Sequence, residues 1–472
     1  MRQRKFDEMV LFAIVALLLI AAIPLGQRRV RPPWPTGRVL HGVADETALL
    51  HPPIEEPSRG VVGHWPANRR CDGALSCGSC TTAQTCGGGG VVNVSGTAAE
   101  NVIRYEDTYD GIHYFQTFDY KTSDVAKLAS HAVYVWGSNQ SISAYRSSNN
   151  PGIILSKYIP FTRDPDGTHN LAYWQSTHPD WVLYKCDKVT PAYEFGGSNV
   201  PLDISNPAVL AWQVQNYGAT ASAAGYDAIA ADNYVLTNVF GACGIYQKGS
   251  WRQLYTGTTD PKYTEDVLAW AGAFQARLHA LPNPIGLIPN FILSDVGAWN
   301  DPRVLSLVAK VDGILDECSF SGCGQTISPQ LWLTVQRLAE YTQSQGKAYF
   351  HINEVKSIDR PTIQFSLASY LMSKEHAAAI FISGSQQYGA DLWRTEYGAP
   401  IGTPCDAMRA TQGVYMRSFT HGLAIANPGT KTVTITLPAG SFKDIYGADV
   451  GSAVTLGPSR GIVLLDSGGP RC

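Results

Sequence analysis

The stretch GYDAIAADNY, residues 225–234, decides the fold. A short run of small and apolar residues, 228–231, leads directly into Asp232, Asn233 and Tyr234, as expected for a buried strand that ends on polar side chains. The segment VDGILDE, residues 311–317, repeats this pattern and ends on two acidic residues. Short apolar strands of this kind are typical of parallel sheets whose faces are covered by helices.

Eight such segments occur between residues 105 and 412. They are residues 112–118, 131–137, 152–161, 226–234, 285–291, 311–320, 347–354 and 377–383. Amphipathic stretches separate them; one begins at Ser328-Pro329 and ends at Gly346. Eight strands alternating with helices over roughly 290 residues predict an α/β fold, the (β/α)8 TIM barrel. A doubly wound open sheet is the alternative, but no glycine-rich nucleotide-binding turn follows a strand.

Two regions depart from this alternation. The span between Phe161 and Tyr226 is too long for one crossover and predicts a helical insertion after the third strand. From residue 413 short alternating strands and Gly-containing turns replace the helices. We therefore predict a catalytic barrel over residues 105–412 and a small C-terminal all-β sandwich domain over residues 413–472.

The N-terminal region resembles an export segment followed by a stalk. Basic residues flank the uncharged apolar run Val10–Gly26, so residues 1–26 are predicted to be either a cleaved signal peptide or a membrane anchor. Residues 27–104 form a Pro/Gly-rich stalk with a cysteine cluster. We expect the protein to be secreted, or membrane-anchored with its catalytic domain outside the cytoplasm.

Residues 1–100 are expected to be dispensable for folding, because they show no core-forming periodicity. A chain that begins near Asn101 should be soluble and should unfold in one cooperative transition, which circular dichroism can follow. Insoluble or molten protein from several starting points near this residue would contradict the prediction.

The ten cysteines favour an oxidising compartment. Four of them lie between residues 71 and 86 and predict a small disulfide knot; zinc is the alternative, although no histidine lies among them. Cys318 and Cys323 bracket a short loop after the sixth strand, and we predict that they pair with each other. Pairing of either one with Cys186 or Cys243 is the alternative. Two N-glycosylation sequons also suit an exported protein.

The charge balance and the motifs exclude several functions. The 36 basic and 39 acidic residues leave a formal net charge of −3, so nucleic acid is not an expected partner. The histidines lack metal-ligand spacing, and no G-x-S-x-G nucleophile elbow is present. No metal or organic cofactor is expected.

Acidic residues stand at the ends of four predicted strands. Asp119 ends the first, Asp232 the fourth, Asp316 and Glu317 the sixth, and Glu354 the seventh. The active site of such a barrel lies at these strand ends. Cleavage of a glycosidic bond needs one carboxylic acid to protonate the leaving oxygen and one carboxylate to face the sugar cation. The same residues could instead bind a divalent cation, cap helices or pair with arginines.

Amide and aromatic residues lie at similar positions. Asn233 and Asn290 can hydrogen-bond sugar hydroxyls, and Trp136 and Trp299 can stack on the apolar face of a pyranose. For each tryptophan, packing in the core is the alternative. Together with the acids, these residues predict a carbohydrate substrate.

The strand-end motifs also resemble a known group of enzymes. GYDAIAADN, residues 225–233, is similar to the fourth-strand signature G-[FY]-D-G-[IV]-x-x-D-N of barrel glycoside hydrolases, with Ala228 in place of the second glycine. HPDWVLY, residues 178–184, resembles the segment that precedes it, and residues 311–317 resemble the sixth-strand ending. The chain thus resembles the hypothetical glycosyl hydrolase families, including family fifteen, with polygalactosaminidase-like barrels as relatives.

The resemblance implies hydrolysis of polysaccharide by a (β/α)8 barrel, with Asp232 and Glu317 as its carboxylate pair. In the related clan that contains α-galactosidases, the strand-four acid is the nucleophile and the strand-six residue is the acid/base. Because Asp316 precedes Glu317, the side chain that points into the cleft stays open, and Glu354 is a further candidate for the second acid. The oligomeric state is not predicted.

We therefore predict a glycoside hydrolase that cleaves O-glycosidic bonds of an extracellular polysaccharide or glycan. One alternative is a non-catalytic carbohydrate-binding barrel at the cell surface, which a cleft with aromatic residues but without a spaced acid pair would favour. Another is a structural spacer, which the absence of a pocket at the strand ends would favour.

Overall fold

The computed structural model describes most of the chain from residue 111 onward. Short stretches within this part are not described: residues 120–124, 126–129, 139–141, 147–149, 151, 165–168, 194–198, 294–295, 386 and 469–471. The predicted export segment, the stalk and the four-cysteine cluster lie outside the described residues. Among the helices that are described, none is long and apolar enough to cross a membrane.

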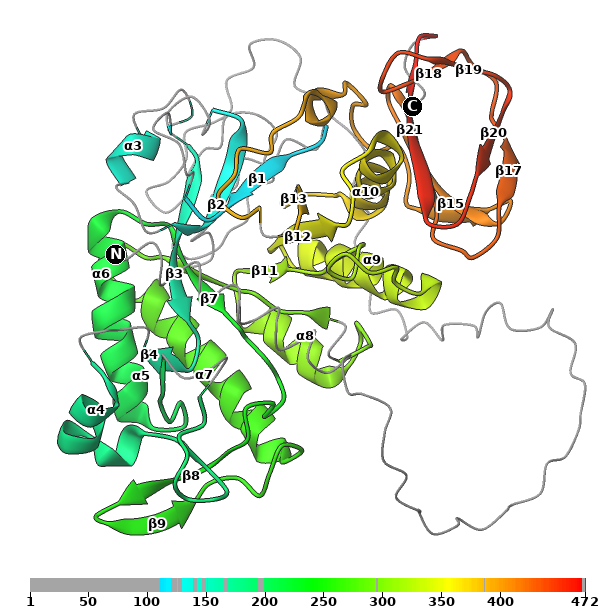
Figure 1. Ribbon diagram of the computed structural model, residues 1–472. Helices are drawn as coiled ribbons and strands as arrows, with labels where there is room; N and C mark the ends of the chain where they lie inside the picture. The colour runs from blue at the N-terminus through cyan, green and yellow to red at the C-terminus, as the bar shows by residue number, and fades with distance from the viewer. Residues whose placement is uncertain are drawn as a thin grey trace, which may run out of the picture. The chain divides into compact units, whose positions relative to one another are not determined.

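Eight parallel strands form the central sheet (Figure 1). They are β1 (Tyr114–Thr117), β2 (Ala132–Ser138), β3 (Ile154–Pro160), β7 (Ala228–Asp232), β10 (Gly286–Pro289), β11 (Gly313–Asp316), β12 (Ala348–Val355) and β13 (Ala378–Gly384). Their spatial order is β10-β7-β3-β2-β1-β13-β12-β11. Each overlaps one of the eight predicted segments.

The two end strands of this sheet, β10 and β11, meet and close the barrel. Asn290, just after β10, forms a parallel bridge with Leu315 of β11. The backbone N–H of Phe291 donates to the carbonyl of Leu315 over 2.8 Å, and that of Asp312 donates to the carbonyl of Leu287 over 2.9 Å. The predicted (β/α)8 barrel is therefore confirmed, and the alternative of an open sheet is wrong.

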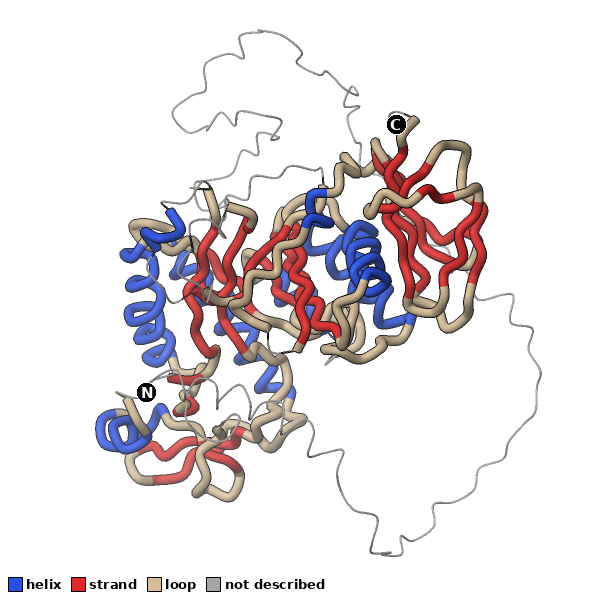
Figure 2. The backbone as a smooth tube through the Cα atoms, turned by 45° about the horizontal axis from the view of Figure 1, so that its top comes forward, coloured by secondary structure: helices blue, strands red, loops and turns tan. Residues whose placement is uncertain are grey.

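Four helices of the outer layer begin in the same way. They are α7 (Pro261–His279), α8 (Pro302–Ala309), α9 (Pro329–Ser344) and α10 (Arg360–Ser373). Each has a proline in its first turn and is preceded by an Asp or Ser whose side chain accepts a hydrogen bond from a backbone N–H of that turn. These local signals start a helix soon after a strand ends, and the helices lie outside the strands (Figure 2).

Aromatic side chains fill the interior of the barrel. Tyr134 stacks on Phe350 at 4.2 Å between ring centroids, and Phe115 lies 5.3 Å from Phe350. All three are fully buried. The barrel interior is thus a packed core and not a channel, so a ligand can bind only at the ends of the strands.

The predicted insertion lies between β3 and β7. Its elements are β4 (Arg163–Asp164), α4 (Leu171–Thr177), a 3-10 turn (Pro179–Trp181), β5 (Tyr184–Lys185), β6 (Val200–Pro201), α5 (Pro207–Gln213), a π-helical turn (Val214–Ala219) and α6 (Thr220–Ala224). Trp174, Trp181 and Leu202 belong to a small core of its own. This core explains why the insertion can be long and still ordered.

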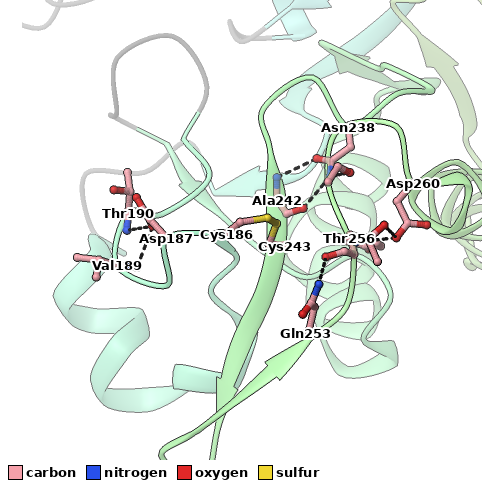
Figure 3. The surroundings of a disulfide bond; sticks show 12 residues. Cys186, Asp187, Val189, Thr190, Asn238, Ala242, Cys243, Gln253, Thr256 and Asp260 are labelled. Atoms are coloured by element: carbon pink, nitrogen blue, oxygen red, sulfur yellow. Dashed lines mark hydrogen bonds between the residues drawn. A yellow bond between two sulfur atoms is a disulfide. The ribbon is translucent and has the colours of Figure 1, made fainter.

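A disulfide bond joins the insertion to the chain that follows β7. The hairpin of β8 (Ala242–Gln247) and β9 (Ser250–Gln253) pairs with β5, and Cys186 is bonded to Cys243 beside this pairing (Figure 3). The side chain of Asn238 donates to the carbonyl of Ala242 over 2.6 Å and accepts from its N–H over 2.8 Å. The start of β8 is therefore held from two sides.

The other two disulfides of the described residues are Cys318–Cys323 and Cys405–Cys472. The predicted pairing of Cys318 with Cys323 is confirmed. The alternative partners, Cys186 and Cys243, are instead bonded to each other. The short bridge fixes the loop that directly follows Glu317.

The C-terminal part is built from antiparallel strands. They are β14 (Arg409–Thr411), β15 (Val414–Phe419), β16 (Gly422–Asn427), β17 (Val433–Thr436), β18 (Phe442–Asp444), β19 (Asp449–Val450), β20 (Ala453–Leu456) and β21 (Arg460–Asp466). Six form one sheet, and β17 pairs with β20. The buried guanidinium of Arg417 donates to the carbonyls of Leu371, Met372 and Lys374 at the end of α10. The fold is thus a barrel followed by a small all-β sandwich, as predicted.

Candidate active site

Three neighbouring strands bring two acids and one amide together. Asp232 is the last residue of β7, Asn290 follows β10, and Glu317 follows β11. The side-chain nitrogen Nδ2 of Asn290 donates to Oδ1 of Asp232 over 3.0 Å and to Oε2 of Glu317 over 2.7 Å. Because β10 lies between β7 and β11 in the closed barrel, the predicted pair from strands four and six meets across the strand that separates them.

This shared donor limits the distance between the two acids. Their bonded oxygens can lie no farther apart than the two hydrogen bonds taken together. This upper limit for the two bonded oxygens admits the carboxyl separation of about 5–5.5 Å of retaining glycosidases and lies below the separation of about 6.5–9.5 Å of inverting enzymes. Both side chains also keep part of their surface open to solvent, as contact with a substrate requires.

Two tyrosines hold the remaining carboxylate oxygens. The hydroxyl of Tyr158, on β3, donates to Oδ2 of Asp232 over 2.9 Å. The hydroxyl of Tyr388, in the segment after β13, donates to Oε1 of Glu317 over 2.6 Å. Sequence reasoning missed both residues. Strand alternation could have indicated Tyr158, which comes two residues before the end of β3, but no pattern marks Tyr388.

Burial, neighbouring charges and hydrogen bonds all act on the pKa values of Asp232 and Glu317. Burial raises the pKa of both carboxyl groups. For Glu317, the negative charges of Asp232 and Glu354 raise the pKa further, while hydrogen bonds from Tyr388 and Asn290 lower it. For Asp232, hydrogen bonds from Asn290, Tyr158 and the backbone of Asn233 lower the pKa and partly offset burial. Because one ionised acid disfavours a second negative charge beside it, the two carboxyl groups titrate as a coupled pair.

Asp316 points away from this pair. Its buried carboxylate accepts a hydrogen bond from the hydroxyl of Tyr349 over 2.9 Å. The Tyr349 ring lies 4.6 Å from His351, which in turn meets Tyr370 of α10 edge-on. Asp316 therefore faces the layer between strands and helices, and Glu317, one residue later, faces Asn290 and Tyr388. The predicted substrate contact of Asp316 is wrong for this reason.

Glu354 and Asn233 do lie beside the acid pair. Glu354 is the residue before the last of β12, and its negative charge acts on Glu317. Burial raises the pKa of Glu354, and hydrogen bonds with Ser385 and Tyr388 lower it. The side-chain nitrogen of Asn233 lies 3.4 Å from Oδ2 of Asp232. The structure thus places Glu354, Asn233 and Asn290 beside the acid pair, and their predicted contact with a substrate stays a prediction.

Three other residues that were predicted to contact the substrate do not lie beside Asp232 and Glu317. Trp136 is 2% exposed and donates to the carbonyl of Ile288 inside the barrel, so it offers no free face to a sugar. Trp299 packs against Tyr341 of α9, with ring centroids 5.9 Å apart. The carboxylate of Asp119 accepts from the hydroxyls of Ser138 and Tyr145. For both tryptophans the alternative of core packing holds.

His351 belongs to the core. It is fully buried, and its Nδ1 lies 2.7 Å from the hydroxyl of Ser319. Burial lowers its pKa to about 3, so it is neutral at physiological pH. Within the described part of the chain, no group of three or more His, Cys, Asp or Glu side chains is arranged to hold a metal ion.

The raised pKa values predict a pH-dependent cost to stability. The folded barrel holds protons on Asp232 and Glu317 more tightly than the unfolded chain does. As the pH rises from about 4 through the raised values, the unfolded chain loses its protons first, so the free energy of unfolding falls. The variant Asp232→Asn/Glu317→Gln lacks this cost and should be more stable than the native protein at pH 7.

Chemical denaturation between pH 4 and 8 checks this expectation. The difference in unfolding free energy between the variant and the native protein should be smallest at pH 4 and should increase with pH. A difference that is constant, or that decreases as the pH rises, would show that the pair does not titrate above its unfolded range.

Comparison with known proteins adds to this geometry. A search of curated proteins finds no match. Solved structures with a similar chain course include an alpha-amylase from Malbranchea cinnamomea (12% identity, TM-score 0.42, covering 76% of this chain and 96% of that one). The glycoside hydrolase domain of PelA from Pseudomonas aeruginosa is also similar (11% identity, TM-score 0.37, 58% and 94% covered).

The sequence also matches a family model. Residues 156–423 match the model of hypothetical glycosyl hydrolase family 15. The matched region begins in β3 and runs into β16, and it includes both acids, Asn290 and Tyr388. Because the match spans more than half of the chain, the protein belongs to hypothetical glycosyl hydrolase family 15.

Proposed function

We propose that the protein is a glycoside hydrolase that cleaves O-glycosidic bonds of an extracellular polysaccharide or glycan with net retention of anomeric configuration. The observation that carries this proposal is the hydrogen bonding of one Asn290 nitrogen to both Asp232 and Glu317. It limits the distance between their bonded oxygens, which supports a covalent intermediate rather than attack by a water molecule held between the acids.

In the first step the ionised Asp232 attacks the anomeric carbon and forms a glycosyl ester. The bond from that carbon to the leaving oxygen breaks, and the leaving oxygen takes the proton of Glu317. In the second step Glu317, now ionised, removes a proton from water. The resulting oxygen nucleophile displaces Asp232 from the anomeric carbon, which restores both acids to their starting states.

The side chains that donate hydrogen bonds to the two acids are neutral, so they can stabilise a negative charge on either acid. Tyr158 and Asn290 stabilise the Asp232 carboxylate before attack and after its release. Asn290 also donates to Glu317, whose negative charge appears only after the leaving group has been protonated. One side chain can therefore follow the negative charge from one acid to the other.

Secretion or membrane anchoring, with the barrel outside the cytoplasm, is part of the same proposal. Three disulfides within the described residues suit an oxidising compartment. The non-catalytic alternative has less support, because it rested on aromatic side chains without an acid pair. Trp136 and Trp299 pack elsewhere, while Asp232 and Glu317 are held together.

The test is the configuration of the first product. The protein is incubated with a panel of soluble polysaccharides, and proton NMR follows the anomeric signal of the new reducing end before mutarotation. We expect the new end to have the configuration of the bond that was cleaved. The opposite configuration would contradict the two-step mechanism, and binding without cleavage across the panel would favour the non-catalytic alternative.

A further inference from the structure

Glu317 is surrounded by more negative charge than two-acid catalysis requires. Asp232 approaches it from β7, Glu354 from β12, and the Tyr388 hydroxyl from the segment after β13, with Asn290 after β10 as the bridging amide. Lysine, arginine and histidine are not among the described groups that shift its pKa. The charges that face Glu317 are therefore all negative, and its hydrogen-bond donors are neutral.

Tyr388 is held in place independently of Glu317. The backbone N–H of the next residue, Gly389, donates to the carbonyl of Thr117 at the end of β1 over 2.9 Å. The ring of Tyr388 meets that of Phe118 edge-on at 5.7 Å. The start of the segment is also closed, since the N–H of Gly384 donates to the side chain of Gln387 over 2.8 Å. The hydroxyl is thus a preorganised donor positioned by β1 and β13.

A single hydroxyl hydrogen faces two acids. Tyr388 donates to Glu317 over 2.6 Å and is also a hydrogen-bonding neighbour of Glu354. Because a tyrosine hydroxyl has one hydrogen, it cannot donate to both carboxylates when both are ionised. This competition adds to the repulsion between the two charges. Burial raises the pKa of both glutamates, and Glu317 also bears the repulsion of Asp232.

We propose that Tyr388 is a positioning residue that fixes the carboxyl group of Glu317, and that the charge of Glu354 keeps the catalytic proton on Glu317. Neither residue is required to touch the reacting atoms. The catalytic meaning of this inference rests on the proposed function, but the electrostatic coupling itself does not depend on any substrate.

Two substitutions should shift the titration of Glu317 in opposite directions. Tyr388→Phe removes a donor to the ionised form, so Glu317 should lose its proton at higher pH. Glu354→Gln removes a like charge, so Glu317 should lose its proton at lower pH. We expect each shift to be about one pH unit, as follows from the strength of a hydrogen bond to a charged group. General disturbance of the site would not produce opposite signs.

The experiment is an infrared titration of the protonated carboxyl band, with the Glu317 signal identified by its loss in Glu317→Gln. It compares the native protein with Tyr388→Phe, Glu354→Gln and the control Tyr370→Phe. The control also removes a buried hydroxyl. That hydroxyl, on Tyr370 of α10, donates to the backbone carbonyl of Ala378 on β13 and not to the acid pair. Melting temperatures confirm that each variant is folded.

Opposite shifts in Tyr388→Phe and Glu354→Gln, with no shift in Tyr370→Phe, would support the inference. Shifts of the same sign, or no shift in either variant, would overturn it. On a cleaved substrate, Tyr388→Phe should lower kcat about tenfold and move the alkaline limb of the pH profile upward. If the titrations shift as expected but no glycan is cleaved, the proposed function fails while the coupling stands.

Discussion

Replacing Asp232 by Asn, or Glu317 by Gln, is expected to abolish hydrolysis while the barrel remains folded. Each change keeps the size of the side chain but removes the nucleophilic charge or the transferable proton. Since cleavage needs both, either loss should lower kcat by about three orders of magnitude or more. Initial rates on a cleaved polysaccharide measure the loss, and circular dichroism verifies the fold.

Asp316→Asn is the matched control for this experiment. Asp316 is adjacent to Glu317 in sequence, but its carboxylate faces Tyr349 in the outer layer. Its neutralisation should lower stability and leave turnover close to that of the native protein. Near-normal turnover of Glu317→Gln, together with inactivity of Glu354→Gln, would instead identify Glu354 as the second acid.

The two variants should also differ from each other in one respect. Glu317→Gln should retain much of its first-step rate on aryl glycosides whose leaving group needs no proton, because Asp232 can still attack the anomeric carbon. Asp232→Asn should be inactive on the same substrates. If neither variant, or both, release the aryl group in the first turnover, the assignment of acid and nucleophile is incorrect.

Removing the Cys186–Cys243 disulfide should cause the largest loss of stability among the predicted changes. The bond joins residues that are 57 positions apart and ties the insertion to β8. Loss of a link of this length should cost about 4 kcal/mol, because the unfolded chain regains the freedom that the closed loop had removed. Denaturant unfolding of Cys186→Ser/Cys243→Ser, compared with the native protein, measures the change.

Cys318→Ser/Cys323→Ser serves as the length control. This bond spans only 5 positions, so the same argument predicts a loss of about 2 kcal/mol, half the effect of the longer bridge. Equal losses in the two variants, or a larger loss for the short bridge, would contradict the loop-length argument. In that case native packing around each sulfur atom would dominate the stability.

Sequence alone identified the eight strands of the barrel and the start of the helix at Pro329. Residues 228–231 and 313–315 are short apolar runs, and the helix that begins at Pro329 carries its own cap, Ser328. Such signals involve residues only a few positions apart, so they can be recognised without knowledge of the fold. The rule that barrel sites lie at strand ends then pointed to Asp232, Asn290 and Glu317.

The tertiary structure decided which side chains meet. Asp316 and Glu317 are adjacent in sequence, and only the course of the backbone at the end of β11 directs the first toward Tyr349 and the second toward Asn290. The predicted sugar contact of Trp136 failed for the same kind of reason, because its position on β2 places the ring inside the barrel.

Hydrogen-bond partners were the hardest part to predict. Tyr158 and Tyr388 reach the acids from strands and segments that are 74 and 71 residues away in the chain. No local pattern encodes such contacts, because they depend on the order in which eight strands close into a barrel. Sequence therefore determined the strands, their polar ends and the candidate acids. The closed barrel decided that one amide bridges Asp232 and Glu317 and that a tyrosine fixes each of them, because burial and distance exist only once distant segments have packed together.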